Sequence, residues 1–162
     1  GKTSLLRAIA GLLEVRSGSI VFRLRNAHAV TTGEERGQFA GWIGHRDGVK
    51  PQFTPRQHLS FHKSYYHCGG DIENALARTG LARLGDLPSQ YLSAGQRRRL
   101  AFARLILGQR PLWLFDEPLS ALDAEGKEFV RQSIERHCSK GGIVVAATHE
   151  PLGVGNLLLE LS

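Results

Sequence analysis

Apolar residues recur at helical spacing in some stretches of this chain and form short continuous runs in others. Residues 1–13 carry leucine and isoleucine at helical spacing after small polar residues, which predicts a loop that runs into a helix. Short apolar runs at residues 20–24 and 39–44 predict strands, and the polar stretch at residues 26–37 predicts a loop between them. The second of these strands ends in another polar loop at residues 45–48.

The second half of the chain continues this alternation after a long helical stretch. The pattern is mostly helical from residue 54 to about residue 107. A continuous apolar run at residues 111–115 predicts a buried strand, residues 124–138 a helix, and residues 143–148 a further strand, while residues 157–161 fit one more. Strands that alternate with helices and end in polar residues indicate an α/β protein with a parallel sheet, and the helical middle is then an insertion on that sheet.

Length and composition limit the class of protein. The 162 residues are 41% hydrophobic, enough for one well-buried core and a small additional subdomain. No run approaches the roughly 20 apolar residues that span a bilayer, so any membrane role would come from a partner. Two cysteines without CxxC spacing favour a reduced cytosolic protein. The chain contains no methionine and opens without a signal sequence, so we expect its natural start to lie further upstream.

The net charge is +6, which fits phosphate ligands, nucleic acid or an anionic membrane surface. Part of the excess is one run, Arg97-Arg98-Arg99. This run fits equally a solvated helix face and a specific anion contact. Charge alone therefore selects no function.

Gly1-Lys2-Thr3-Ser4 matches the end of a G-x-x-x-x-G-K-[ST] phosphate-binding loop. Backbone N–H groups at a helix start bind phosphate, Lys2 would neutralise its charge, and the Thr3 hydroxyl would ligate Mg²⁺. By itself the tetrapeptide is a weak motif, because so short a match also arises by chance.

Two acidic residues, Asp116 and Glu117, follow the apolar run at residues 111–115. The end of a buried parallel strand lies at the sheet edge where α/β proteins bind ligands. Asp116 would hold Mg²⁺ through water, and Glu117 would polarise an attacking water molecule. The alternative is an ordinary strand end with solvated carboxylates.

The segment 91–96, Tyr-Leu-Ser-Ala-Gly-Gln, can begin a helix with Ser93 as its N-cap. Together with the Arg-Arg-Arg-Leu-Ala-Phe-Ala-Arg that follows, it closely resembles the signature motif of ABC ATPases. Residues 118–123, Pro-Leu-Ser-Ala-Leu-Asp, look like that family's D-loop, and His149 looks like its switch histidine. The phosphate-loop tail, the signature and the acid pair stand in the family's order.

This resemblance implies a P-loop ABC cassette, with a RecA-like parallel-sheet core at residues 1–49 and 106–162 and an inserted helical subdomain at about residues 50–105. The cofactors would be ATP and Mg²⁺, and a second copy would form a head-to-tail dimer with ATP between the subunits. The first sheet strands and the aromatic residue that stacks on adenine would precede this chain, so we expect these 162 residues alone to bind ATP poorly. The residues that would act on the subunit's own nucleotide are Lys2, Thr3, Asp116, Glu117 and His149. Those that would contact the partner's nucleotide are Ser93, Ala94, Gly95 and Gln96. Asp123 would lie at the interface.

His45 departs from the family pattern, and the segment around it narrows the resemblance to one group within the family. His45 stands where ABC ATPases usually carry a glutamine that contacts the metal and the membrane subunit. The segment 44–51, Gly-His-Arg-Asp-Gly-Val-Lys-Pro, resembles the ATP-binding subunits of bacterial haem exporters in cytochrome c maturation. This likeness implies a peripheral protein on the cytoplasmic face of the inner membrane. Its partner would be the exporter's integral membrane permease, and hydrolysis would serve haem delivery to a periplasmic haem chaperone.

Two other functions stay open, along with a separate metal site. Another ABC importer or exporter would use the same catalytic residues. An ABC ATPase that acts on DNA or ribosomes would also suit the positive charge, although the chain lacks the long coiled coils of the DNA-repair type, and we expect no nucleic-acid partner. A group of possible metal ligands fits either a metal site or structural histidines, the reading that we favour for want of a clear third ligand: His58, His62, His67 and Cys68.

Overall fold

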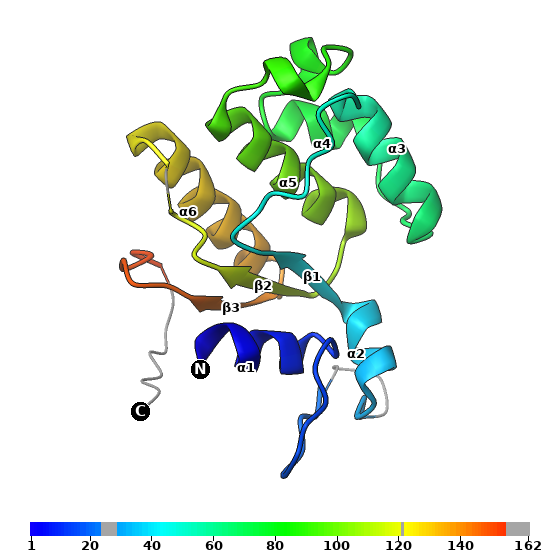
Figure 1. Cartoon of the computed structure of the whole chain (residues 1–162), viewed down its shortest axis with the longest axis vertical. Helices are drawn as coiled ribbons and strands as arrows, with labels where there is room; N and C mark the ends of the chain where they lie inside the picture. Colours follow the sequence, from blue (N-terminus) through cyan, green and yellow to red (C-terminus); the bar gives the residue numbers. More distant parts are fainter. Residues whose placement is uncertain (24–28, 121, 155–162) are drawn as a thin grey trace.

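The computed structural model describes residues 1–23, 29–120 and 122–154, and three parallel strands form its centre (Figure 1). The strands are β1 (Ala40–Ile43), β2 (Leu112–Asp116) and β3 (Ile143–Ala147), in the spatial order β1-β2-β3. Both pairs are parallel, as the alternation of strands and helices predicts. The predicted strand at residues 157–161 lies outside the described residues.

Helices cover both faces of this sheet, which explains why β2 is apolar at every position before its end (Figure 1). Helix α1 (Lys2–Ile9) lies on one face, while α5 (Ala94–Gly108) and α6 (Ala124–Ser139) lie on the other. Leu112 and Leu114 join the core on the α1 side. Trp113 and Phe115 join the larger core with α5 and α6, as the two-residue period of a strand requires.

A second core lies in the helical middle of the chain. It is built by α3 (Pro55–Tyr65), α4 (Ile72–Arg78), the loops after them and one face of α5. Helix α5 contributes Phe102 to the sheet core and Leu100 to the helical core, and therefore belongs to both regions. The division of the chain at residues 50 and 105 stays a prediction.

The loop predicted at residues 26–37 is wrong over its second half, where α2 (Gly33–Phe39) forms instead. Two glycines hide this helix in the sequence. It begins because the Thr32 hydroxyl accepts a hydrogen bond from the Glu35 N–H at 3.2 Å. It is anchored because the buried Arg36 guanidinium donates to backbone carbonyls of four residues, namely Ala8, Ile9, Ile20 and Thr31.

The strand predicted at residues 20–24 also differs from the structure. In its described part there is one isolated antiparallel bridge, between Phe22 and Val30. A single hairpin bridge has no neighbouring strand to extend it, so the apolar run does not become a sheet strand. Among the described helices, none is long and apolar enough to cross a bilayer.

Candidate active site

Three chain segments meet at the carboxyl end of the parallel sheet and bring five side chains together. The first turn of α1 supplies Lys2 and Thr3, the end of β2 supplies Asp116 and Glu117, and the turn after β3 supplies His149. Lys2 and His149 are 147 positions apart in the chain. Their meeting follows from the crossover connections of a parallel sheet, which return every strand end to the same edge.

Thr3 and Asp116 form the part of this site that suits a cation. The Thr3 hydroxyl donates to both carboxylate oxygens of Asp116, at 3.1 and 3.0 Å. A hydroxyl and a carboxylate are the hard oxygen ligands that Mg²⁺ prefers, and Mg²⁺ usually takes only one or two from the protein and keeps several waters. This pair of oxygens therefore fits the predicted Mg²⁺.

Lys2 stands beside the start of α1, where the phosphates of a nucleotide would lie. The N-cap of α1 is Gly1, which has no side chain to occupy the first helical N–H groups. Those groups and the helix dipole favour an anion there. The Lys2 ammonium lies 3.3 Å from Nδ1 of His149 and donates to it, so these two exposed side chains lie side by side.

Glu117 is held in an unusual backbone conformation at the end of β2. Its φ is +54°, in the left-handed region that residues with side chains adopt at a cost. The Glu117 N–H donates to the Ala147 carbonyl at 2.8 Å, which ties the turn to β3. On the side chain, Oε2 accepts from the His149 N–H at 3.4 Å, and Oε1 lies 3.5 Å from Nε2 of His149. The carboxylate is thereby aimed at His149.

The signature residues form a helix start, as predicted for Ser93. Its hydroxyl accepts from the Gln96 N–H at 3.2 Å, and the Gln96 side chain accepts from the Ser93 N–H at 2.8 Å. Ala94 is exposed, and a Cβ built on Gly95 would come no nearer than 3.9 Å to its nearest neighbour, the Ser93 hydroxyl. This helix start therefore presents an open surface, and the side-chain hydrogen bonds between Ser93 and Gln96 stay within the cap.

No side-chain hydrogen bond within the described residues joins Asp123 or His45 to the five clustered side chains. Asp123 caps α6, because its carboxylate accepts from the Gly126 N–H at 2.8 Å. His45 is exposed in the bend after β1. Their assigned roles at the interface and in metal contact stay predictions.

Arg98 is a residue whose importance the sequence analysis missed. It is 5% exposed, rather than lying on a solvated helix face. Its guanidinium donates to the Gly44 carbonyl at 3.0 Å, to the Asp47 carboxylate at 2.9 Å and to the Glu117 carbonyl at 3.0 Å. A signal was present in the sequence: positions 98, 101, 102 and 105 follow the spacing of one helix face, and the other three are buried apolar residues.

The histidines of α3 serve the packing of the helical region. Nε2 of His58 lies 3.1 Å from both the N–H and the carbonyl oxygen of Lys50, and the His62 ring packs 4.5 Å from the Tyr66 ring. Burial, then the charges of Arg104 and Arg110, lowers the pKa of His62 from 6.5 to about 4. In the described part of the chain, no three His, Cys, Asp or Glu residues are grouped to hold a metal.

A parallel sheet that gathers a lysine and threonine from a helix start, two carboxylates and a histidine defines a nucleotide-binding ATPase cassette. Residues 1–120 match the family described as ABC transporter, and the chain belongs to this family. It is accordingly an ABC ATPase, and its enzymatic activity is ATP hydrolysis.

Curated relatives similar to this chain carry the name of an export protein. The protein named cytochrome c biogenesis ATP-binding export protein CcmA from Rhodopseudomonas palustris (strain BisB5) is 45% identical over 157 residues, which are 95% of this chain and 75% of that protein. The protein of the same name from Nitrobacter winogradskyi is 47% identical over 155 residues, again 95% of this chain and 75% of the relative.

Solved structures confirm the fold. The dimeric ATP-binding cassette MJ0796 in a post-hydrolysis state, bound to ADP and Pi, superposes with a TM-score of 0.76 at 23% identity. The match covers 93% of this chain and 70% of that one. The predicted α/β architecture, a parallel sheet with an inserted helical region, is therefore confirmed.

Proposed function

We propose that this ABC ATPase supplies the energy for haem export during the maturation of c-type cytochromes, with Glu117 as its catalytic base. The cluster of Lys2, Thr3, Asp116, Glu117 and His149 carries the catalytic part of the proposal. Two observations support the haem part: the relatives named for cytochrome c biogenesis at 45% and 47% identity, and the segment 44–51 that resembles haem exporters.

Each residue of the cluster has a role that its position supports. Lys2 and the N–H groups at the start of α1 bind the terminal phosphates. Thr3 and Asp116 would hold Mg²⁺, which when bound neutralises charge on the phosphates. Glu117 accepts a proton from the attacking water and orients it. His149 donates to the γ-phosphate, which is transferred to water as ADP leaves. Its contacts with Glu117 and Lys2 hold it beside these two side chains.

The second copy of the chain completes the site in this proposal. Ser93, Ala94, Gly95 and Gln96 form an exposed helix start, which suits contact with the phosphates of a nucleotide held by the partner. Asp123 caps the start of α6 and would face the other subunit. The similar cassette MJ0796 is described as a dimer, which supports this arrangement.

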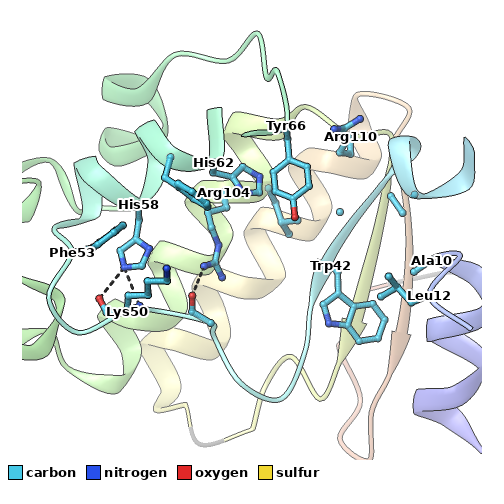
Figure 2. A pocket seen from close by; sticks show the side chains of 17 residues that line it. Ala10, Leu12, Trp42, Lys50, Phe53, His58, His62, Tyr66, Arg104 and Arg110 are labelled. Carbon is cyan, nitrogen blue, oxygen red and sulfur yellow. Dashed lines mark hydrogen bonds between the residues drawn. The ribbon is translucent and has the colours of Figure 1, made fainter. Parts of the chain in front are cut away.

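The membrane partner docks, we propose, in a groove between the sheet and the helical region (Figure 2). The groove has a volume of about 580 Å³. Figure 2 shows His62, Tyr66 and Arg104 along one wall and Trp42 and Leu12 on the opposite wall. Among the described residues that line it, none is acidic, while Lys50, Arg104 and Arg110 are basic.

The lining of the groove indicates the chemistry of its occupant. The exposed aromatic residues Phe61 and Tyr66 line the groove, Phe61 on α3 and Tyr66 directly after its end, and the exposed Tyr65 lies next to Tyr66. A basic floor with aromatic walls fits a short cytoplasmic segment of the membrane subunit that carries carboxylates and apolar side chains. Docking there would hold the chain on the cytoplasmic face of the bacterial inner membrane.

The Glu117→Gln variant of the full-length protein tests the catalytic assignment. Because an amide cannot accept the proton, we expect hydrolysis to fall by about 10²–10⁴-fold. ATP binding should persist. Because the bound ATP is not hydrolysed, the variant should remain a dimer, as measured by light scattering. Retained turnover would contradict the role of Glu117.

The haem assignment needs a cellular readout. Cells that carry Glu117→Gln in place of the natural chain should accumulate c-type apocytochromes without covalently attached haem, measured by haem staining of membranes. If these cells attach haem normally although the purified variant does not hydrolyse ATP, the proposed role in haem export is contradicted. The assignment as an ATPase would remain intact.

A further inference from the structure

The loop after β1 and the catalytic turn after β2 are joined by one buried side chain, Arg98. Its Nη1 donates to the Gly44 carbonyl at 3.0 Å and to the Asp47 carboxylate at 2.9 Å, and these two residues flank His45. Its Nη2 donates to the Glu117 carbonyl at 3.0 Å. The side chains of Arg98 and Asp47 are 6% and 24% exposed, so their ion pair is screened much less than a surface pair.

The contact with Glu117 is made at a strained point of the backbone. Glu117 has a φ of +54°, and its carbonyl accepts from Arg98 and, at 3.3 Å, from the Ser120 N–H. A residue with a side chain keeps such a conformation when its surroundings impose it. Because the backbone angles of Glu117 set the direction of its carboxylate, the guanidinium that holds the carbonyl also sets the aim of the catalytic group.

The contact with the other loop continues to the proposed docking groove. Arg104, which lines the groove, donates to the Gly48 carbonyl at 2.9 Å and also to the Asp47 carbonyl. Gly48 itself lines the groove. An unbroken set of contacts therefore runs from the groove through the loop at residues 44–48 to Arg98 and on to Glu117.

Stability alone does not explain this arrangement. Nε of Arg98 is buried and has no hydrogen-bond partner among the described residues, and an unpaired buried donor destabilises a fold. The two Nη atoms are instead satisfied by partners on two separate loops.

We propose that Arg98 is a positioning residue that transmits displacement of the loop at residues 44–48 to the carboxylate of Glu117. A segment docked in the groove shifts the loop, the Asp47–Arg98 pair follows it, and Glu117 moves into or out of line with His149. The planar guanidinium suits this task because it holds two partners in one fixed geometry. The inference rests on Glu117 acting as the catalytic base.

Steady-state ATPase kinetics of the full-length protein test the inference. Arg98→Gln should lower kcat by about 10- to 100-fold, as misplacement of a catalytic group does. Its KM for ATP should stay within about threefold, because Lys2 and Thr3 are untouched. Arg98→Lys keeps the charge but cannot bridge both loops, so its kcat should stay well below that of the natural protein.

A double-mutant cycle tests the pairing with Asp47. Asp47→Asn keeps an acceptor and loses the charge, and should lower kcat by less than Arg98→Gln does. The two changes combined should lower kcat no further than Arg98→Gln alone, because they break one link. Additive effects would overturn the inference.

Two controls separate positioning from loss of stability. Thr79→Val removes a buried hydroxyl that donates to the carbonyls of Ala75 and Leu76. Both of these acceptors are in α4 and belong to neither loop. Arg56→Gln removes a surface guanidinium paired with Asp86 and Glu73. Both should keep kcat within about twofold, whatever their Tm.

The outcomes are distinct. Two results would overturn the role of Arg98: a kcat of Arg98→Gln equal to that of the natural protein, or an equally large loss of kcat in Thr79→Val at a similar fall in Tm. Undiminished turnover by Glu117→Gln would instead overturn the proposed catalytic base, independently of Arg98.

Discussion

At the scale of single residues, His62 shows how burial changes a side chain that the sequence presents as a metal-ligand candidate. Its ring lies against Tyr66 and near Arg104 and Arg110. Loss of solvent and two positive charges disfavour the imidazolium, so the ring is neutral in the folded protein at neutral pH.

This shift predicts the pH dependence of stability. Below about pH 6.5 the unfolded chain takes up a proton at His62 that the folded chain takes up only near pH 4. The free energy of unfolding should therefore decline as pH falls from 6.5 towards 4. Burial lowers the pKa of His58 and His137 in the same direction.

The measurement is urea denaturation between pH 7 and pH 4, comparing the natural protein with His62→Gln. The variant should show a shallower decline, because Gln does not titrate. His67→Asn is the control, since residue 67 is exposed, has a φ of +51° that Asn tolerates, and should leave the slope unchanged. An unchanged slope for His62→Gln would contradict the assignment.

At the scale of elements, two helices of the chain begin with the same device. Thr54 caps α3 with Gln57, and Ser93 caps α5 with Gln96, each in a reciprocal capping box. The sequence alone shows both as helix starts. Only the position of α5, exposed at its start and shared by both cores, gives one cap a candidate role beyond folding.

The pair predicts a difference that separates folding from function. Thr54→Ala and Ser93→Ala should each reduce the free energy of unfolding by about 1 kcal/mol. Thr54→Ala should keep the ATPase rate of the dimer, and Ser93→Ala should lower it, because Ser93 is proposed to contact the partner's nucleotide. Equal rates for the two variants would show that Ser93 acts as a cap alone.

At the scale of the whole molecule, the basic groove accounts for part of the net charge of +6. Charge reversal at Lys50 or Arg110 should weaken association with the membrane subunit by at least about tenfold, because like charges then face each other across the interface. Co-purification from detergent-solubilised membranes measures this. Arg83→Glu reverses an exposed charge outside the groove and is the matched control; equal retention of all three variants would contradict docking there.

Much of the fold and the residues of the candidate site could be predicted from the sequence because their signals are local. Three patterns each span only a few neighbouring residues: the apolar run before Asp116, the helical spacing after Thr3 and the cap at Ser93. Such local patterns predict helices and strands directly from the periodicity of the backbone. Helix α2 was missed because its anchor, Arg36, acts through carbonyls of distant segments.

By itself, the sequence determined which chemical groups this protein possesses and the order in which they occur. Tertiary structure alone decided which of them meet: Lys2 with His149 across 147 positions, and Arg98 with both Asp47 and Glu117. The physical reason is that burial and hydrogen-bond geometry depend on packing between distant segments. An arginine in a basic run therefore becomes a buried connector once α5 lies against the sheet.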